Sequence, residues 1–471
     1  MLTALAGAAG CKVGPAYKAP TMQAPPAYSE NGAQPPANWS VAAPADEANR
    51  GAWWAVYSDA QLNHLEEQCA SANLTIAAAT QAYDQSHALV QSVRSSLFPS
   101  VSLGASATRN RISSYRPLRP TTAPNYYWDF LIPLNISWDP DIWGRIRRQV
   151  ESASASAQAS AADLANTRLS LQGTLAASYF QIRGIDLQAK LLRSSVDAYA
   201  QTLTLTEDRR KGGLASESDV EQAKTQLEQT RAQLIDLGVQ RSRLEHAIAV
   251  LISVPAQTFK VEENPLAGDP PVTPTGVPSE LLQRRPDIAT AERRVAAANA
   301  NIGVQKAAYY PSIMLGAAGG VESSDITTLM NPSSTLWNAG PSASEILFDA
   351  GRRKANVQAA VAAREQATDE YRQQVLSAFR DVEDQLSALR ILSDEAKVQQ
   401  RAVQSAERST ELSIMRYKRG LAPYLEVLTN QTIQLSNERA AAGLVADRIV
   451  ASVGLQVALG GGWQSSELPK N

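Results

Sequence analysis

Residues that could catalyse a reaction or bind a metal are few and scattered in this chain. The three histidines, His64, His87 and His246, fall in separate helical segments without the spacing of metal ligands. The sequence has no glycine-rich phosphate loop, no nucleophile elbow and no carboxylate pair with an evident pocket. The formal net charge of −2 gives no basic footprint for nucleic acid. We therefore expect no enzyme activity, no metal site, no cofactor and no nucleic-acid partner.

Cys11 is the residue whose surroundings indicate a covalent modification. Residues 1–10 are small and apolar, like the end of a signal peptide whose charged region is missing. Ala8-Ala9-Gly10-Cys11 resembles a bacterial lipoprotein processing site, although Ala8 departs from the usual leucine. We expect a covalent lipid such as palmitate on Cys11; a plain signal peptide with an incidental cysteine is the alternative. Cys69 is expected to be a packed free thiol, with a Cys11–Cys69 disulfide as the other possibility.

The chain repeats itself. Three landmarks recur in the same order: Pro99-Ser100 returns as Pro311-Ser312, Gly144-Arg145 as Gly351-Arg352, and Gly213-Leu214-Ala215 as Gly420-Leu421-Ala422. A period of about 200 residues is too long for a solenoid unit. The sequence therefore predicts an internal two-fold repeat.

The positions of prolines and periodic segments divide the chain. Residues 1–10 are a signal-peptide remnant, 11–58 a proline-rich tether, 253–278 a linker and 460–471 a C-terminal tail. Repeat 1 covers 59–252 and repeat 2 covers 279–459. Each repeat is expected to contain a β-hairpin (about 99–139 and 311–349) and a sharp tip turn between helices (about 209–218 and 416–425).

The expected hairpins have one apolar and one polar face. Apolar and polar residues alternate from Val101 to Thr108 and again from Trp128 to Asp139, which is typical of strands. Aromatic residues cluster near the strand ends, as in membrane barrels; a soluble sheet with one wet face is the alternative. No apolar run of about 18 residues stands out, so we expect no transmembrane helix.

Very long helices follow the hairpins. Residues 146–208 contain no proline, and their apolar residues have coiled-coil spacing over about 95 Å. The next helix, 217–252, spans about 54 Å, so the helix at 74–97 must stack on it end to end. The second long helix is expected at 352–416. Four strands cannot close a barrel, and open strand edges are forbidden in lipid. If these strands meet lipid, at least two chains must therefore share one barrel.

This plan resembles the outer membrane factor (TolC-like) family, in its efflux lipoprotein branch. The matching stretches are Cys11–Tyr17, Arg284–Ile288 and the two tip turns. The resemblance covers essentially the whole chain. It implies a mainly α protein, a homotrimer with a long coiled-coil α-barrel in the periplasm and a twelve-stranded barrel shared by three chains in the bacterial outer membrane. It also implies export of drugs or other small solutes with an inner-membrane pump and a periplasmic adaptor.

The resemblance assigns roles to the tip. The adaptor would dock on the turns formed by Gly213, Leu214, Ala215, Gly420, Leu421 and Ala422. Asp219, Tyr417 and Glu426 match positions that close the tip in the family, whereas Ala422 and Thr429 depart from it. Asp219 and Glu426 could form a negative ring that narrows the lumen, or could be ordinary first-turn acids that favour a helix N-terminus.

Other interpretations remain open at this stage. A lipid-anchored coiled-coil scaffold without a pore explains the helices but not the two hairpins. Metal efflux and type I secretion use similar exit ducts. Arg284–Asp287 has a mainly structural reading as a helix start. Glu345 occupies the position that matches Trp138, and it could lie at the membrane interface or point inward.

Overall fold

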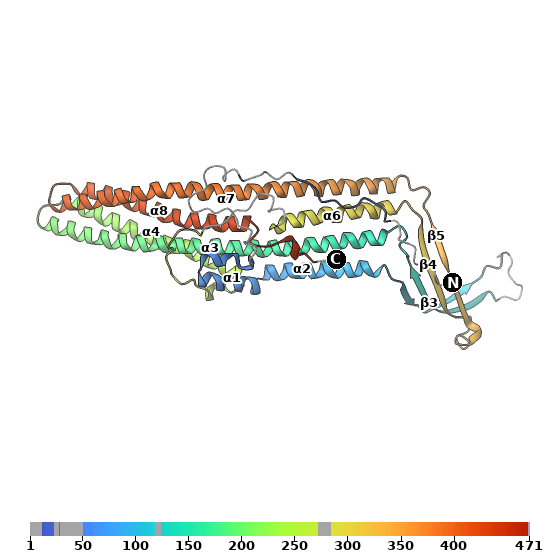
Figure 1. Ribbon diagram of the computed structural model, residues 1–471. Coiled ribbons are helices and arrows are strands. Elements are labelled where there is room, and N and C mark those ends of the chain that lie inside the picture. Colours follow the sequence, from blue (N-terminus) through green and yellow to red (C-terminus); the bar gives the residue numbers. More distant parts are fainter. Residues whose placement is uncertain are drawn as a thin grey trace.

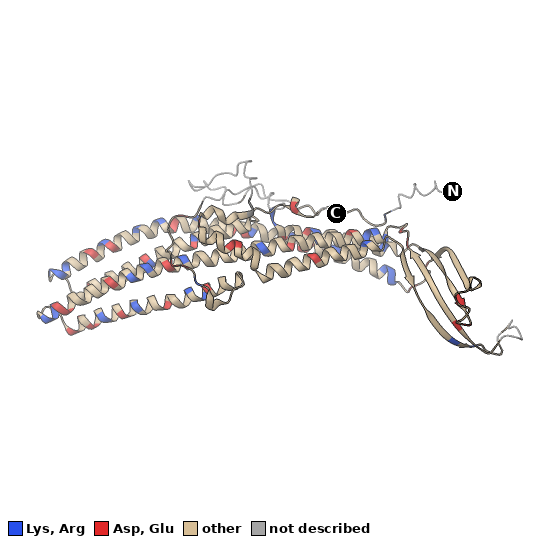
Figure 2. Cartoon of the chain, turned by 90° about the horizontal axis from the view of Figure 1, so that it is seen from below, with Lys and Arg blue, Asp and Glu red and all other residues tan. Residues whose placement is uncertain are grey.

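The computed structural model describes residues 12–22, 28, 50–115, 117, 124–271 and 284–469. The signal-peptide remnant, Cys11, and parts of the tether and linker lie outside the described residues. The described chain is an elongated helical body with strands at one end and two helical turns at the other (Figure 1 and Figure 2). It is mainly helical, as predicted.

The helices have the lengths that the apolar spacing predicts. The two longest, α3 and α7, have 67 residues each, and α4 and α8 have 35 each. The helix bounds are α1 (Ala60–Ala72), α2 (Leu74–Ser95), α3 (Arg145–Lys211), α4 (Glu217–Leu251), α6 (Pro286–Ala307), α7 (Arg352–Lys418) and α8 (Tyr424–Ala458). Short 3₁₀ turns are η2 (Arg50–Tyr57), η3 (Ala256–Thr258), η5 (Pro332–Ser334) and η6 (Ser465–Glu467).

The helices lie side by side in one layer. Near the strands the order of packed neighbours is α2, α3, α6 and α7, and toward the turns it is α4, α3, α8 and α7. Thus α3 and α7 run the full length, while shorter helices are stacked in pairs beside them. The layer has two edges: α2 and α4 form one, and α7 forms the other.

In each stacked pair, a side chain at the start of the helix nearer the strands contacts the end of the helix nearer the turns. Asn73 caps α2 and donates through Nδ2 to the carbonyl of Leu251 at the end of α4, 2.7 Å away. At the second joint, Arg285 precedes α6 and donates to the carbonyl of Ala458 at the end of α8 (3.1 Å). Its guanidinium also binds Asp287 and Asp381. The segment around Arg285 therefore has the structural role predicted from its sequence.

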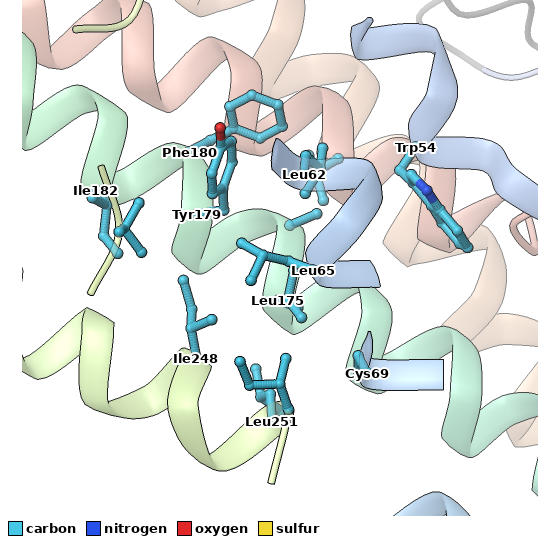
Figure 3. Packing of buried hydrophobic residues seen from close by; sticks show 14 of the residues in the cluster. Trp54, Leu62, Leu65, Cys69, Leu175, Tyr179, Phe180, Ile182, Ile248 and Leu251 are labelled. Atoms are coloured by element: carbon cyan, nitrogen blue, oxygen red, sulfur yellow. The ribbon is translucent and has the colours of Figure 1, made fainter. Parts of the chain in front are cut away.

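The largest apolar cluster lies where α1 and η2 pack on α3 and α4. Leu62 and Leu65 of α1 contact the region of Leu175 and Tyr179 on α3 and of Ile248 on α4 (Figure 3). Cys69 belongs to this cluster as a buried free thiol, as expected. Burial of this cluster holds the short helices against the long one.

The expectation that no apolar run of about 18 residues stands out needs correction. Within the described residues, α8 contains an 18-residue window of mean hydropathy 1.4, long and apolar enough to cross a membrane. However, α8 packs along α7 and against α3. Its alanine- and valine-rich sequence is therefore explained by packing on two neighbours.

The strands form one antiparallel sheet. Its members are β1 (Ser100–Leu103), β2 (Ser106–Arg111), β3 (Tyr126–Trp138), β4 (Ser312–Ser323) and β5 (Thr335–Ser344). β3 pairs with β1 and β2 on one side and with β4 on the other, and β5 pairs with β4. The two predicted hairpins are thus joined by β3 and β4.

The first predicted strand is broken into β1 and β2. The break lies at Gly104, whose N–H donates to the carbonyl of Pro133 (2.9 Å). Proline has no N–H to return the second bond of this pair, so the ladder is interrupted there. The last strand, β5, ends at Ser344, earlier than the end predicted for the second hairpin near residue 349.

Candidate functional site

The two tip turns have the same backbone geometry. Gly213 and Gly420 have positive φ angles of 71° and 73°, which suits glycine at a helix C-terminus. The N–H of Leu214 donates to the carbonyl of Arg209 (2.8 Å), and that of Leu421 donates to Arg416 (2.9 Å). The leucine side chains are 69% and 66% exposed. The tip therefore presents two apolar side chains on matching turns.

The two predicted gate acids make local contacts in the chain. Asp219 forms a capping box: its N–H donates to Ser216 Oγ (3.1 Å) and its carboxylate accepts from the N–H of Ser216 (2.9 Å). Glu426 pairs with Arg416 at 2.8 Å. Asp219 thus has the helix-starting role considered from the sequence, and Glu426 links α8 back to α7.

Tyr417 is buried between the two turns. It is 3% exposed, and its ring packs edge-on against Tyr424 with centroids 5.7 Å apart. The guanidinium of Arg209 lies 4.7 Å above the Tyr417 ring, and it donates to the carbonyl of Lys418 at 3.2 Å. Burial raises the pKa of Tyr424 to about 12, with the neighbouring Tyr417, Tyr199 and Asp219 adding to the effect. Tyr417 is therefore part of an interhelix contact.

Sequence reasoning missed Arg209 and Tyr424. Arg209 lies in the last turn of α3, where a basic residue is expected to interact with the helix dipole. That local signal gives no hint that its guanidinium reaches α7. The structure joins Arg209, Tyr417 and Tyr424, and leaves Asp219 and Glu426 in separate contacts.

The sheet has two chemically different faces. Side chains of directly paired residues in antiparallel strands lie on the same face. We call one face the apolar face; its residues are Val101, Leu103, Ala107, Arg109, Arg111, Tyr126, Trp128, Phe130, Ile132, Leu134, Ile136, Trp138, Ile313, Leu315, Ala317, Gly319, Val321, Ser323, Thr335, Trp337, Ala339, Pro341 and Ala343. The other face carries mainly Ser, Thr, Asn, Gly and the acids Asp129 and Glu322.

Aromatic residues and an ion-pair cluster mark the junction between strands and helices. Trp138 Nε1 donates to the carbonyl of Leu97 (2.9 Å), and Trp143 stacks on Tyr310 with centroids 4.7 Å apart. Glu345 lies just after β5 and pairs with Arg353 at 2.9 Å. Glu345 thus lies at the base of the sheet, and whether it faces the membrane interface or the lumen stays a prediction.

The start of the described N-terminal segment lies against the same junction, and Tyr17 and Met22 pack farther along on α6 and α7. The buried guanidinium of Arg148 donates to the carbonyls of Val13, Gly14 and Pro15 at 3.0–3.2 Å. A Cβ on Gly14 would lie 2.5 Å from the Cα of Gly303 in α6, so glycine permits this close approach. The matching stretch that starts at Cys11 is therefore fixed to the body from its second residue onward.

Within the described residues, no group of three or more His, Cys, Asp or Glu is placed to hold a metal ion. The described residues present two apolar turns at one end, a two-faced sheet at the other, and helix edges along the sides.

Comparisons with known proteins identify a family and relatives that match most of the chain. The family model described as outer membrane efflux protein matches residues 65–253 and 277–461. The pyoverdine export outer membrane protein OpmQ of Pseudomonas aeruginosa is 32% identical over 449 residues, covering 93% of this chain and 94% of that protein. The cation efflux system protein CusC of Escherichia coli O157:H7 is 27% identical, with 97% and 96% coverage. The solved structure of the outer-membrane channel OprN has a TM-score of 0.88 and 30% identity, covering 96% of this chain and all of that one.

Proposed function

Since the chain belongs to the outer membrane efflux protein family, we propose that three copies form one channel through which small molecules leave the cell. Membership of the family makes the chain an outer-membrane efflux component. The trimer, the closed barrel, the lipid anchor, the tip gate and the substrate class are parts of the proposal.

The observation that carries the proposal is the position of exposed apolar side chains on the helices. Within the described residues, α3 and α6, which lie inside the layer, have no exposed large apolar residue. The edge helices do: Leu74 and Leu89 on α2; Ile235, Val239 and Val250 on α4; Val361, Leu376, Ile391, Val398, Leu412 and Met415 on α7. The inner helix α8 has two near the tip, Leu425 and Ile433. Burying both edges requires neighbouring chains.

The open edges of the sheet lie on the same sides of the chain as the apolar helix edges. β1 and β2 follow α2, and β5 precedes α7, so the open strands and the apolar helix edges lie on the same two sides. An unpaired strand edge in lipid leaves backbone groups unsatisfied, at several kcal/mol each. Contact between two different edges closes a ring by rotation. Three copies, the number that the family resemblance implies, would give a twelve-stranded barrel above a tunnel of helices.

The lengths of the elements support the predicted internal repeat. α3 and α7 have equal length, as do α4 and α8, and each long helix flanks one stacked pair. Two similar units per chain would make the trimeric tunnel nearly six-fold symmetric. Such a tunnel would continue from the barrel into the periplasm.

We infer that Cys11 carries the lipid anchor. Support comes from the fixed position of Lys12 and the residues after it, at the junction between helices and strands. A lipid attached just before this segment would lie near the membrane. C11S should remove the lipid mass from the mature protein and leave the junction contacts of Arg148 intact.

At the other end, the exposed Leu214 and Leu421 are suited to docking of a periplasmic adaptor, with Ala215 and Ala422 in the same turns. The adaptor would connect the channel to an inner-membrane pump. Asp219, Tyr417 and Glu426 would hold the tip narrow. The D219A/E426A variant should raise single-channel conductance; unchanged conductance would refute the gate role.

The substrate class rests on the relatives. OpmQ is named for pyoverdine export and CusC for cation efflux. This chain is more similar to OpmQ than to CusC, with 32% against 27% identity, so we propose organic small molecules as cargo. Cation export and protein secretion are the alternatives within a channel function, and a poreless scaffold is the alternative outside it.

The test is to purify the full chain in detergent, measure particle mass and record conductance in a planar bilayer. Trimers that give small, stable conductance steps are expected. Monomers that do not insert would refute the channel and favour a lipid-anchored helical scaffold.

A further inference from the structure

Two arginines interrupt the apolar face of the sheet. Among the described strand residues of this face, Arg109 and Arg111 are the charged ones, and both lie at the end of β2 that is far from the helices. The acids at this end, Asp129 and Glu322, belong to the opposite face. Because the sheet separates the acids from the arginines, the apolar face keeps two positive charges at this end.

Aromatic rings hold both guanidinium groups. Arg109 is paired with Trp128 and Arg111 with Tyr126 in the strand register. The Cζ atoms lie 5.6 Å and 5.5 Å from the centroids of these rings. A guanidinium over an aromatic face is stabilised and keeps its N–H donors free at its edge. The two groups are therefore oriented for an anion that approaches along the apolar face.

The arginines lie at the depth expected for lipid headgroups, an argument that rests on the proposed membrane function. Trp128 and Trp138 are separated by ten positions of β3. That is about 33 Å along a strand and about 23 Å along the axis of a barrel whose strands tilt by about 45°, close to the apolar band of about 25 Å in such barrels. Trp138 adjoins the helices, so Trp128 marks the far, outer interface. Arg109 is level with it, and Arg111 lies just beyond.

We propose that Arg109 and Arg111 bind the phosphate groups of a phosphorylated glycolipid in the outer leaflet of the membrane. Side chains two residues apart on a strand are separated by about 7 Å, so the pair can contact two phosphate groups of one headgroup. Arginine binds phosphate through two parallel hydrogen bonds. Phe130 and Ile132 continue the apolar face from this site toward the helices, and they give the acyl chains a surface that free phosphate would not use.

Native mass spectrometry of the detergent-solubilised full-length trimer tests the site with three lipid probes: diphosphoryl lipid A, monophosphoryl lipid A and phosphatidylglycerol. The trimer should retain diphosphoryl lipid A most strongly. R109Q/R111Q should weaken this binding about 25-fold, since each arginine near a charged lipid surface contributes about a fivefold factor. R109K/R111K keeps both charges but loses the planar fork, so it should give an intermediate affinity and also guards against a folding defect.

T108Q/N110Q is the matched control, because Thr108 and Asn110 alternate with the arginines and lie on the opposite face of β2. It should bind diphosphoryl lipid A like the unaltered protein. Unchanged affinity in R109Q/R111Q would overturn the site. Equal retention of phosphatidylglycerol would overturn the glycolipid assignment, and displacement by equimolar inorganic phosphate would overturn the lipid source.

Failure of this inference differs from failure of the channel function. If the protein forms stable conducting trimers but its lipid affinity does not depend on the arginines, only the lipid site is refuted. Absence of trimers and conductance in the unaltered protein would refute the channel on which the site depends.

Discussion

Glycine at position 184 allows α3 and α8 to approach each other closely. A Cβ built on Gly184 would lie 2.6 Å from Cβ of Ala446. Carbon atoms in favourable contact are about 3.5–4.0 Å apart, so G184A must separate the helices by about 1 Å. Because α3 belongs to repeat 1 and α8 to repeat 2, this contact helps to hold the two repeats together.

The magnitude follows from two opposing effects. Overpacking of a close contact costs about 1–3 kcal/mol, whereas alanine in a helix is favoured over glycine by about 1 kcal/mol. Gly443, on α8 one turn from Ala446, has no atom within 4 Å of a built Cβ. G443A should therefore gain about 1 kcal/mol, and G184A should be less stable than G443A by about 1–3 kcal/mol.

Exchange of the two side chains gives a sharper test. A446G alone should cost about 2 kcal/mol through helix propensity and a lost buried methyl group. In G184A/A446G the methyl group moves from α8 to α3. The new Cβ at position 184 then lies 3.9 Å from the Cα at position 446, an ordinary contact distance. The double variant should lie within about 1 kcal/mol of the unaltered protein, because the clash is gone.

The assay is urea denaturation followed by helical circular dichroism at one fixed protein concentration, since oligomer stability depends on concentration. Strong non-additivity, with the double variant more stable than the sum of the singles, is expected. Additive effects, or a G184A variant as stable as G443A, would contradict the contact between α3 and α8.

Three further predictions concern ionisable side chains. Burial raises the pKa of the Glu66 carboxyl group to about 9, so the folded protein keeps this group protonated. Its contribution to the free energy of unfolding is complete below about pH 4.5 and is lost as the pH rises toward 9. E66Q should remove this pH dependence from the denaturation midpoints. R148A frees the carbonyls of Val13, Gly14 and Pro15, and hydrogen exchange in residues 12–22 should rise by more than tenfold, whereas unchanged protection would refute the clamp. R209A removes the contacts with Tyr417 and Lys418 that join the two tip turns, so single-channel conductance should rise, with R209K between the two; no change would show that these contacts do not restrain the tip.

Most of the secondary structure could be predicted because its signals are local. The long helix predicted at 146–208 is observed at Arg145–Lys211, and the turn predicted at about 209–218 lies between α3 and α4. Heptad spacing, glycine at turns and period-two alternation depend only on neighbouring residues. The pairing of β3 with β4 connects segments about 180 residues apart and left no local pattern.

The site was harder to predict because its contacts cross between helices. The resemblance indicates Tyr417 but not its partners Arg209 and Tyr424, because nothing in their sequence neighbourhoods predicts the contact. Arg109 and Arg111 were overlooked for a similar reason. Alternation alone places them on a face, and only the register shows that this face is the aromatic one.

The central claim is that one edge of the chain meets the other edge of a neighbour, and photo-crosslinking tests it most directly. A crosslinking amino acid at Val361 or Val398 lies on the exposed edge of α7, and one at Gln181 on the inner helix α3 serves as the control. The account predicts interchain crosslinks from Val361 to α2 and from Val398 to α4, and none from Gln181. Crosslinks between two α7 helices, or no interchain product, would contradict the ring.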